Sequence, residues 1–406
     1  MWVLEMRKIY ETIPASKNNS PSALKRHFLL DPTVTFLNHG SFGATPRPVM
    51  KAYRRWQNEL ERQPVAFLGR QATDLLRQAR SNLAQFLGTS ANNLVFVTNA
   101  TVGLNIVARS LKLSDQDEVL ASDHEYGALD RTWHFLALKQ HFKYINLPVS
   151  LPVTNPADFV EDLWRGVSRR TRVIFLSHIT SPTALIFPVR EICRRAREAG
   201  ILTVIDGAHA PGQIPLMLDE LGADFYSGNL HKWLCAPKGA AFLYARPEVQ
   251  TLIEPLVVSW GWESETPSDC QFVDYLEWMG TRDLSPFLAV KDAIEFQETY
   301  RWDQVRERCH ALAAATQKQI VELTGIPPLQ SGPDVWFAQM MTAPLPPQTD
   351  LAWLKQALYD TYHIEVPLIR WNEQALIRVS FQGYNTQSDA DRLIAALKRL
   401  LYGQST

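Results

Sequence analysis

The sequence predicts an α/β protein with a large, doubly wound, mostly parallel sheet and a smaller α+β domain. Between about residues 90 and 245, short β-branched or apolar runs alternate with amphipathic helical stretches. Such alternation is typical of right-handed crossovers, which cover both faces of a parallel sheet with helices. The 406 residues are also more than one small core requires, which favours a second domain.

Five apolar or β-branched runs are expected to be strands of the large sheet. They lie at residues 94–97, 118–121, 172–176, 201–205 and 239–244. A helix is expected over residues 189–199, because its Arg and Glu side chains share one face and Gly200 follows it.

The C-terminal part of the chain follows a different pattern. We expect helices over 302–324 and 388–402, strands over 335–338 and 375–380, and breaks at the prolines of 327–328 and 344–347. The chain therefore divides into three predicted regions. An N-terminal segment (1–60) packs across the small domain and the cleft, a large α/β domain covers 61–290, and a small α+β domain covers 291–406.

The composition excludes several classes of function. Forty-one basic residues nearly balance 42 acidic ones, so no net field favours a nucleic acid or an anionic membrane as partner. The four cysteines are scattered without CxxC pairs, and no apolar signal segment follows the early charges. We expect a cytoplasmic protein without a disulfide framework. Phosphate-loop, zinc-protease and serine-hydrolase motifs are absent, and no metal site is expected.

Residues that follow the strands are the candidates for chemistry, because open α/β sheets bind ligands at the carboxyl ends of their strands. The turn over 98–103 reads TNATVG and leads into a helix. Backbone N–H groups of Ala100 and Thr101, with the threonine hydroxyl, would form a phosphate cradle there. Taken alone, the same turn is also explained as an ordinary helix cap.

Three further positions belong to the same edge of the predicted sheet. Asp206 ends a strand, where a carboxylate could hold the nitrogen of an aromatic heterocycle protonated, although it could also cap a helix. Lys232 lies between His231 and Trp233, and an apolar setting would lower its pKa and favour Schiff-base chemistry. Tyr126 offers a flat face for stacking on a ring, unless it is a core tyrosine.

The joint order of these motifs resembles the class V aminotransferase family of fold-type I pyridoxal-phosphate (PLP) enzymes. The order is NAT at 99–101, DHEY at 123–126, DGAH at 206–209 and SGNLHK at 227–232. The resemblance runs from FLNHGSFG at 36–43 to IRVS at 377–380. Within the family, HKWLCAPK at 231–238 and IEVP at 364–367 look most like isopenicillin N epimerase and its relatives.

The resemblance implies pyridoxal 5′-phosphate as cofactor and a role for each matching residue. Lys232 would form the Schiff base and carry the α-proton, and Asp206 would pair with the pyridine nitrogen. His209 would reach the phenolic oxygen of the ring, and Tyr126 would stack on it.

The phosphate and substrate contacts follow in the same way. The phosphate would be held by Ala100 and Thr101, with Asn229 and His231 nearby, and by Thr281 of a second subunit, which implies a homodimer. The substrate would be bound by Arg378, which clamps its α-carboxylate, with Asn38 and Ser181 beside it.

The expected activity is α-proton removal from a small amino-acid substrate, and epimerisation is the leading outcome. Transamination, or C–S cleavage of a cysteine-type amino acid, would share the first step. Tyr126 and His209 are both candidates for the second acid of an epimerase. No cysteine occurs at 362–367, which disfavours persulfide transfer, and no GxGxxG follows a strand, which disfavours a nicotinamide enzyme. A catalytically silent binding protein is the non-enzymatic alternative.

Overall fold

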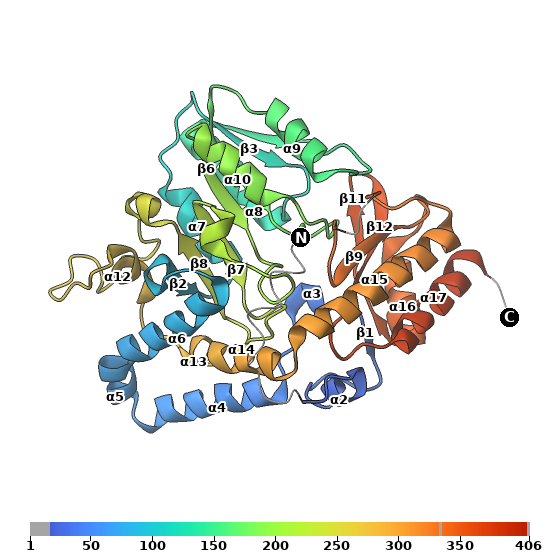
Figure 1. Ribbon diagram of the computed structural model, residues 1–406, viewed down its shortest axis with the longest axis horizontal. Coiled ribbons are helices and arrows are strands. Elements are labelled where there is room, and N and C mark those ends of the chain that lie inside the picture. Colours follow the sequence, from blue (N-terminus) through green and yellow to red (C-terminus); the bar gives the residue numbers. More distant parts are fainter. Residues whose placement is uncertain (1–16, 333–334, 404–406) are drawn as a thin grey trace.

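The structure is a computed structural model that describes residues 17–332 and 335–403. Its main sheet has seven strands in the order β2-β8-β7-β6-β5-β3-β4 (Figure 1). The strands are β2 (Leu94–Val97), β3 (Glu118–Ser122), β4 (Lys143–Leu147), β5 (Thr171–Ser177), β6 (Leu202–Asp206), β7 (Phe225–Asn229) and β8 (Ala241–Ala245). Five neighbouring strands, from β7 to β4, are parallel, and β8 runs antiparallel to both β2 and β7. The predicted doubly wound, mostly parallel sheet is confirmed.

The sequence did not identify two of these strands. β4 is an edge strand whose residues are half-buried or exposed, so it lacks the continuous apolar run of a central strand. β7 is fully buried but reads FYSGN, and its polar end resembles a turn. Its small residues are a packing requirement, since a Cβ on Gly228 would lie 2.8 Å from the Phe242 ring.

Helices cover both faces of the sheet, and each face has its own apolar core. On one face lie α7 (Ala100–Ser110), α8 (Gly127–Gln140) and α12 (Gln271–Glu277). On the other lie α6 (Ala72–Leu87), α9 (Pro156–Arg165) and α10 (Val189–Glu198). The helix expected over 189–199 is thus confirmed as α10.

A second, three-stranded sheet lies beside the first (Figure 1). It consists of β11 (Leu368–Trp371), β12 (Gln374–Ser380) and β9 (Met340–Pro344), all antiparallel. The helices α15 (Trp302–Thr324), α16 (Leu351–Tyr362) and α17 (Gln387–Tyr402) accompany it.

The prediction of a strand at 335–338 is wrong, because those residues form turns and bends. Trp336 is buried there, and its carbonyl accepts a hydrogen bond from the Ile186 N–H at 2.7 Å. Trp336 packs against Phe159 of α9 and Phe337 against His310 of α15, whereas Val335 is exposed.

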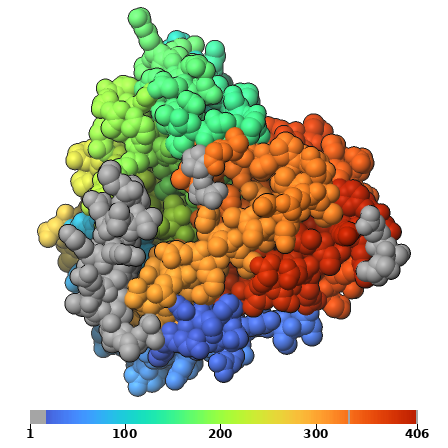
Figure 2. All heavy atoms as spheres, turned by 45° about the vertical axis from the view of Figure 1, so that its right-hand side comes forward, coloured from blue at the N-terminus to red at the C-terminus, as the bar shows by residue number. Residues whose placement is uncertain are grey.

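The N-terminal segment joins the two sheets. Strand β1 (Thr35–Phe36) pairs in parallel with β10 (Ile364–Glu365), and α4 (Arg47–Arg62) packs on α13 (Ser285–Leu288) and α14 (Val290–Thr299). Figure 2 shows these N-terminal residues in blue beneath the orange and red C-terminal ones. Residues 1–16 of the predicted 1–60 segment lie outside the described residues, and the domain boundaries at 60 and 290 stay predictions.

Shorter elements complete the chain. They are α2 (Pro21–Lys25), α3 (His39–Phe42), α5 (Pro64–Ala66), the short π-helix η2 (Phe67–Gln71), α11 (Leu218–Leu221) and the 3-10 helices η3 (Ala91–Asn93) and η4 (Pro247–Leu252). No helix within 17–332 or 335–403 is both long enough and apolar enough to cross a membrane.

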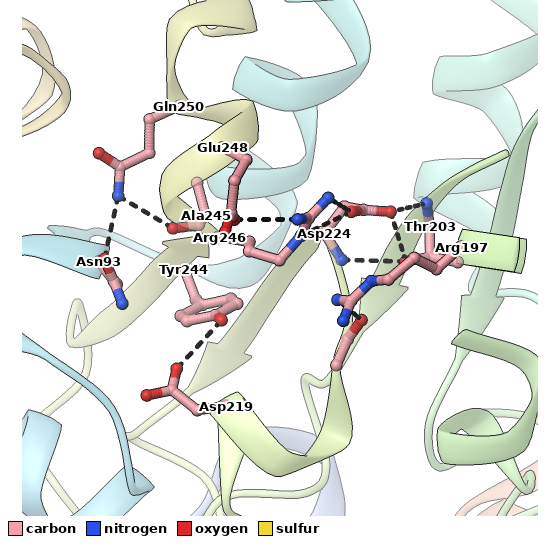
Figure 3. Close-up of polar contacts among 11 residues, drawn as sticks. Asn93, Arg197, Thr203, Asp219, Asp224, Tyr244, Ala245, Arg246, Glu248 and Gln250 are labelled. Atoms are coloured by element: carbon pink, nitrogen blue, oxygen red, sulfur yellow. Dashed lines mark hydrogen bonds and ion pairs between the residues drawn. The ribbon is translucent and has the colours of Figure 1, made fainter. Parts of the chain in front are cut away.

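A buried acid holds the amino end of β7 to its neighbours, at the edge of the sheet opposite the carboxyl ends (Figure 3). Asp224 accepts hydrogen bonds from the Thr203 N–H and hydroxyl at 2.8 and 3.0 Å. Its other oxygen accepts from Arg246 Nε and Nη2 at 3.0 and 2.7 Å. One carboxylate therefore ties β6, β7 and the end of β8 together.

We expect Asp224→Ala to lower the free energy of unfolding by about 3 kcal/mol, because it removes the buried partner of the Arg246 guanidinium and the acceptor of the Thr203 N–H and hydroxyl. Urea denaturation measures this loss. Glu248→Ala removes the exposed acid that also pairs with Arg246, and should cost less than about 1 kcal/mol. Equal losses in the two variants would contradict the assigned role of Asp224.

Candidate active site

A cavity of about 480 Å³ opens at the carboxyl ends of β5, β6 and β7, facing the start of α7. Its volume suits a small organic ligand. Nine of the residues expected at the site line it: Ala100, Thr101, Tyr126, Ser181, Asp206, His209, Asn229, His231 and Lys232. Widely separated segments of the sequence thus meet here because parallel strands end at the same edge of the sheet.

Lys232 lies in this cavity just after β7, and the next two residues, Trp233 and Leu234, are fully buried. Its Nζ is 3.2 Å from His209 Nε2. Burial lowers the pKa of the Lys232 amine, and the positive charge of Arg378 lowers it further. A larger fraction of this amine is therefore neutral, and nucleophilic, than of a solvated lysine at the same pH.

His209 is held in one orientation and one protonation state. Its Nδ1 accepts a hydrogen bond from the Trp233 indole N–H at 3.3 Å, so the neutral ring carries its proton on Nε2. Burial and the charges of Lys232 and Arg378 keep the pKa of His209 well below its usual value. The ring can thus donate one hydrogen bond from Nε2 into the cavity.

The backbone of Lys232 is anchored from behind by the N-terminal segment. His39 Nε2 lies 3.0 Å from the Lys232 carbonyl oxygen, and its Nδ1 lies 2.9 Å from the Tyr384 hydroxyl. Gly43 has φ of +71°, and a Cβ there would lie only 2.0 Å from the His231 carbonyl oxygen. The close approach explains why a glycine ends the FLNHGSFG motif.

Asp206 is the last residue of β6 and is almost fully buried. Its Oδ1 accepts from the Ala208 N–H at 2.9 Å, and its Oδ2 has no hydrogen-bond partner among the described residues. Burial raises the pKa of this carboxyl group, and the nearby Lys232 charge opposes the rise. An oxygen free to accept a bond fits the protonated nitrogen of a heterocycle.

A second carboxyl group lies behind Asp206. Glu125 accepts hydrogen bonds from the Ser122 hydroxyl and from the Ser177 N–H and hydroxyl, at 2.6 to 2.7 Å. Burial raises the pKa of Glu125 to about 8, with a further contribution from the negative charge of Asp206. Burial therefore favours the protonated form of Glu125, which weakens its competition with Asp206 for a cation.

The start of α7 offers donors to an anion. The Asn99 side chain caps Val102 N–H, and Ala100 N–H already donates to Asn229 Oδ1 at 2.9 Å. In the part of the chain that the structure describes, the Thr101 N–H and hydroxyl have no partner. A phosphate would thus meet Thr101 directly, while Asn229 acts by fixing Ala100.

Arg378 reaches the cavity's edge from β12. Its Nη1 donates to the carbonyl and hydroxyl oxygens of Ser181, and its Nη2 donates to the Ser41 hydroxyl at 3.0 Å. No acidic side chain within the described ranges pairs with it, and its Nε has no partner. A buried guanidinium that has no carboxylate partner in the protein can bind the carboxylate group of a ligand.

Three expected residues lie outside the cavity lining, namely Asn38, Thr281 and Arg378, although Arg378 bonds to the lining residues Ser41 and Ser181. Asn38 contacts Ser41 rather than the cavity, and Thr281 is exposed on the loop after α12. Sequence reasoning in turn missed Ser41 and Glu125, although both occur inside motifs that it singled out. Side-chain direction within a short motif has no sequence signal of its own. No group of three or more metal-binding side chains occurs in the described residues.

The fold and this cavity define the class of protein. The sequence profile of the family described as aminotransferase class-V matches residues 43–393, and the chain belongs to this family. It is therefore a pyridoxal-phosphate-dependent enzyme. The residues present fit the cofactor: a deep amine, a buried carboxyl group with a free oxygen and an open helix N-terminus share one cavity.

Individual proteins are also similar to the chain in sequence or in structure. The isopenicillin N epimerases of Amycolatopsis lactamdurans and Streptomyces clavuligerus are 39% and 36% identical over 91% and 92% of this chain, and 96% of each of those proteins. A putative L-cysteine desulfhydrase of Oryza sativa subsp. japonica is 27% identical over 91% of this chain and 83% of that protein. A cysteine desulfurase of Escherichia coli has the same fold, with a TM-score of 0.79, 22% identity, and coverage of 95% of this chain and 99% of that one. The expected fold-type I architecture is confirmed.

We expect the apoprotein to bind pyridoxal phosphate covalently at Lys232 with a rate that rises with pH, because only the neutral amine reacts. Its midpoint should lie below the pKa of about 10.4 of a solvated lysine. In Arg378→Met, loss of the positive charge should raise the pKa of Lys232 and move the midpoint to higher pH. Stopped-flow absorbance measures the rate, and exposed Arg190→Met is the control. Superimposable profiles for all three proteins would contradict the effect of Arg378.

Proposed function

We propose that this enzyme inverts the configuration at the α-carbon of an amino acid, with isopenicillin N as the first substrate to test. The observation that carries the proposal is a single cavity holding the Lys232 amine and the Asp206 carboxyl group, with Arg378 at its edge. The two epimerase relatives, at 39% and 36% identity, support the choice of reaction.

Bound pyridoxal phosphate would act as an electron sink, which acidifies the α-proton of an attached amino acid. Asp206 would keep the ring nitrogen protonated and so maintain the sink. The neutral Lys232 amine would take the α-proton, and its depressed pKa makes it a base at neutral pH. Arg378 would hold the α-carboxylate, and His209 would donate from Nε2 to the phenolic oxygen.

Inversion also needs a proton donor on the face of the α-carbon opposite to Lys232. His209 is hydrogen-bonded to Lys232 itself, so it is poorly suited to the opposite face. Tyr126 lines the cavity, is 44% exposed, and its hydroxyl has no hydrogen-bond partner in the described part of the chain. We propose Tyr126 as the second proton carrier.

C–S cleavage of a cysteine-type amino acid is the second candidate, favoured by the desulfhydrase relative at 27% identity. It would share the α-proton step. Transfer of sulfur through a protein persulfide lacks support, because all four cysteines are buried and none lines the cavity. The exposed position of Thr281 suits the proposal that a second copy of the chain supplies it to the cofactor phosphate.

The proposal is tested with holoenzyme in deuterated water, offered isopenicillin N and, separately, L-cysteine. We expect α-deuteration with inversion of isopenicillin N and neither keto acid nor sulfide. Lys232→Ala should lose the visible absorbance of the bound cofactor and all exchange. Sulfide from L-cysteine without inversion of isopenicillin N would favour the lyase instead.

The variant Tyr126→Phe distinguishes the proposed roles of Lys232 and Tyr126 as proton carriers. Removing a general acid typically costs 10²- to 10⁴-fold in rate, so inversion should slow by roughly this range. The epimer whose α-hydrogen faces Lys232 should still exchange that hydrogen with the solvent, with retention of configuration. Parallel loss of both reactions would instead assign Tyr126 a role in binding the cofactor.

A further inference from the structure

A chain of hydrogen bonds leads from Arg378 to an acidic residue that does not touch the cavity. Arg378 Nη2 donates to Ser41 Oγ at 3.0 Å, and Ser41 Oγ donates to Asn38 Oδ1 at 2.5 Å. Asn38 Nδ2 donates to Glu365 Oε1 at 2.9 Å. The four side chains come from β12, α3, the residue before α3 and β10.

All donors in this chain point the same way. The guanidinium can only donate and the Glu365 carboxylate can only accept, so the hydroxyl of Ser41 and the amide of Asn38 each have one consistent orientation. Aligned hydrogen bonds polarise one another, which strengthens each of them. The chain therefore couples a cation to an anion through two neutral side chains.

The backbone holds the members of this chain in register. Phe36 of β1 lies opposite Glu365 of β10, and the Leu37 N–H donates to the Glu365 carbonyl oxygen at 2.9 Å. Asn38 forms a parallel bridge with Ser380, two residues after Arg378. The N-terminal segment thus fixes Asn38 between the acid and the arginine.

The charges at the two ends of this hydrogen-bond chain suit it to orienting Arg378. Arg378 is 5% exposed and, in the described residues, contacts only neutral oxygens directly. A carboxylate of the protein in direct contact would occupy the guanidinium and compete with a ligand. Glu365 is a counter-charge that is separated from Arg378 by two side chains, Ser41 and Asn38. It orients the guanidinium and leaves the positive charge available to bind a ligand.

We propose that Glu365 and Asn38 are positioning residues that act through Ser41 to aim Arg378 at the substrate α-carboxylate. This inference rests on the proposed function, which assigns the carboxylate to Arg378. It predicts that the two residues control selectivity for amino acids over the amines that lack only the carboxylate. Neither residue lines the cavity.

The test titrates holoenzyme with L-2-aminobutyrate and with 1-aminopropane, and follows the visible absorbance of the cofactor. Glu365→Ala and Asn38→Ala should each raise the Kd for aminobutyrate about tenfold, the loss expected for one charge-assisted hydrogen bond. The Kd for aminopropane should stay within about twofold, because no carboxylate is involved.

Two conservative variants and one control sharpen the result. Glu365→Gln keeps an acceptor for Asn38 but removes the counter-charge, so its Kd for aminobutyrate should lie between those of the wild type and Glu365→Ala. Asn38→Asp has no N–H to donate to Glu365 and adds a like charge, so it should be as damaging as alanine. Glu322→Ala removes an exposed acid of α15 and should change neither Kd.

Each outcome bears on a different premise. If Glu365→Ala raised the Kd for aminobutyrate and aminopropane equally, the residue would have only a general structural role and the inference would be overturned. Unchanged Kd values for both ligands would overturn it as well. Wild-type protein that binds aminopropane as tightly as aminobutyrate would overturn the assignment of Arg378 itself. Thermal melting of each variant checks that the fold is retained.

Discussion

The removal of one lysine amine from water is the constraint on which the rest of this site depends. Burial and a nearby guanidinium destabilise the charged form of Lys232 and lower its pKa, which suits the amine to the proposed roles of nucleophile and base. The same environment keeps His209 neutral and leaves Asp206 as the acid that faces the lysine charge. A solvated lysine with the same sequence neighbours would have neither property.

The sheet creates that environment by bringing strand ends together. Asp206 ends β6 and Asn229 ends β7, and the turn after β7 returns Lys232 to the same edge. Small residues are needed where the backbones approach, as at Gly43 against the His231 carbonyl. The opposite edge is held by the Asp224 and Arg246 pair, so the strands are fixed at both ends.

The N-terminal segment completes the site from outside the main sheet. His39 binds the carbonyl of Lys232, and Asn38 connects Glu365 to the serine that contacts Arg378. Residues that are adjacent in sequence thus serve the lysine on one side and the arginine on the other. Lys232 and Arg378 are therefore both contacted by this one N-terminal segment.

The sequence by itself determined the doubly wound sheet, the family and nine of the 17 residues that line the cavity, because apolar periodicity and short motifs can be read directly from the linear sequence. It also led to Arg378, through resemblance. It missed β7, whose buried polar end looks like a turn, and it wrongly assigned a strand to 335–338. Only the tertiary structure decided that Asn38 bonds to both Ser41 and Glu365, and that Glu365 ends this chain of hydrogen bonds. The Asn38–Glu365 and Ser41–Arg378 contacts join residues 327 and 337 positions apart, and their geometry depends on packing that no local pattern encodes.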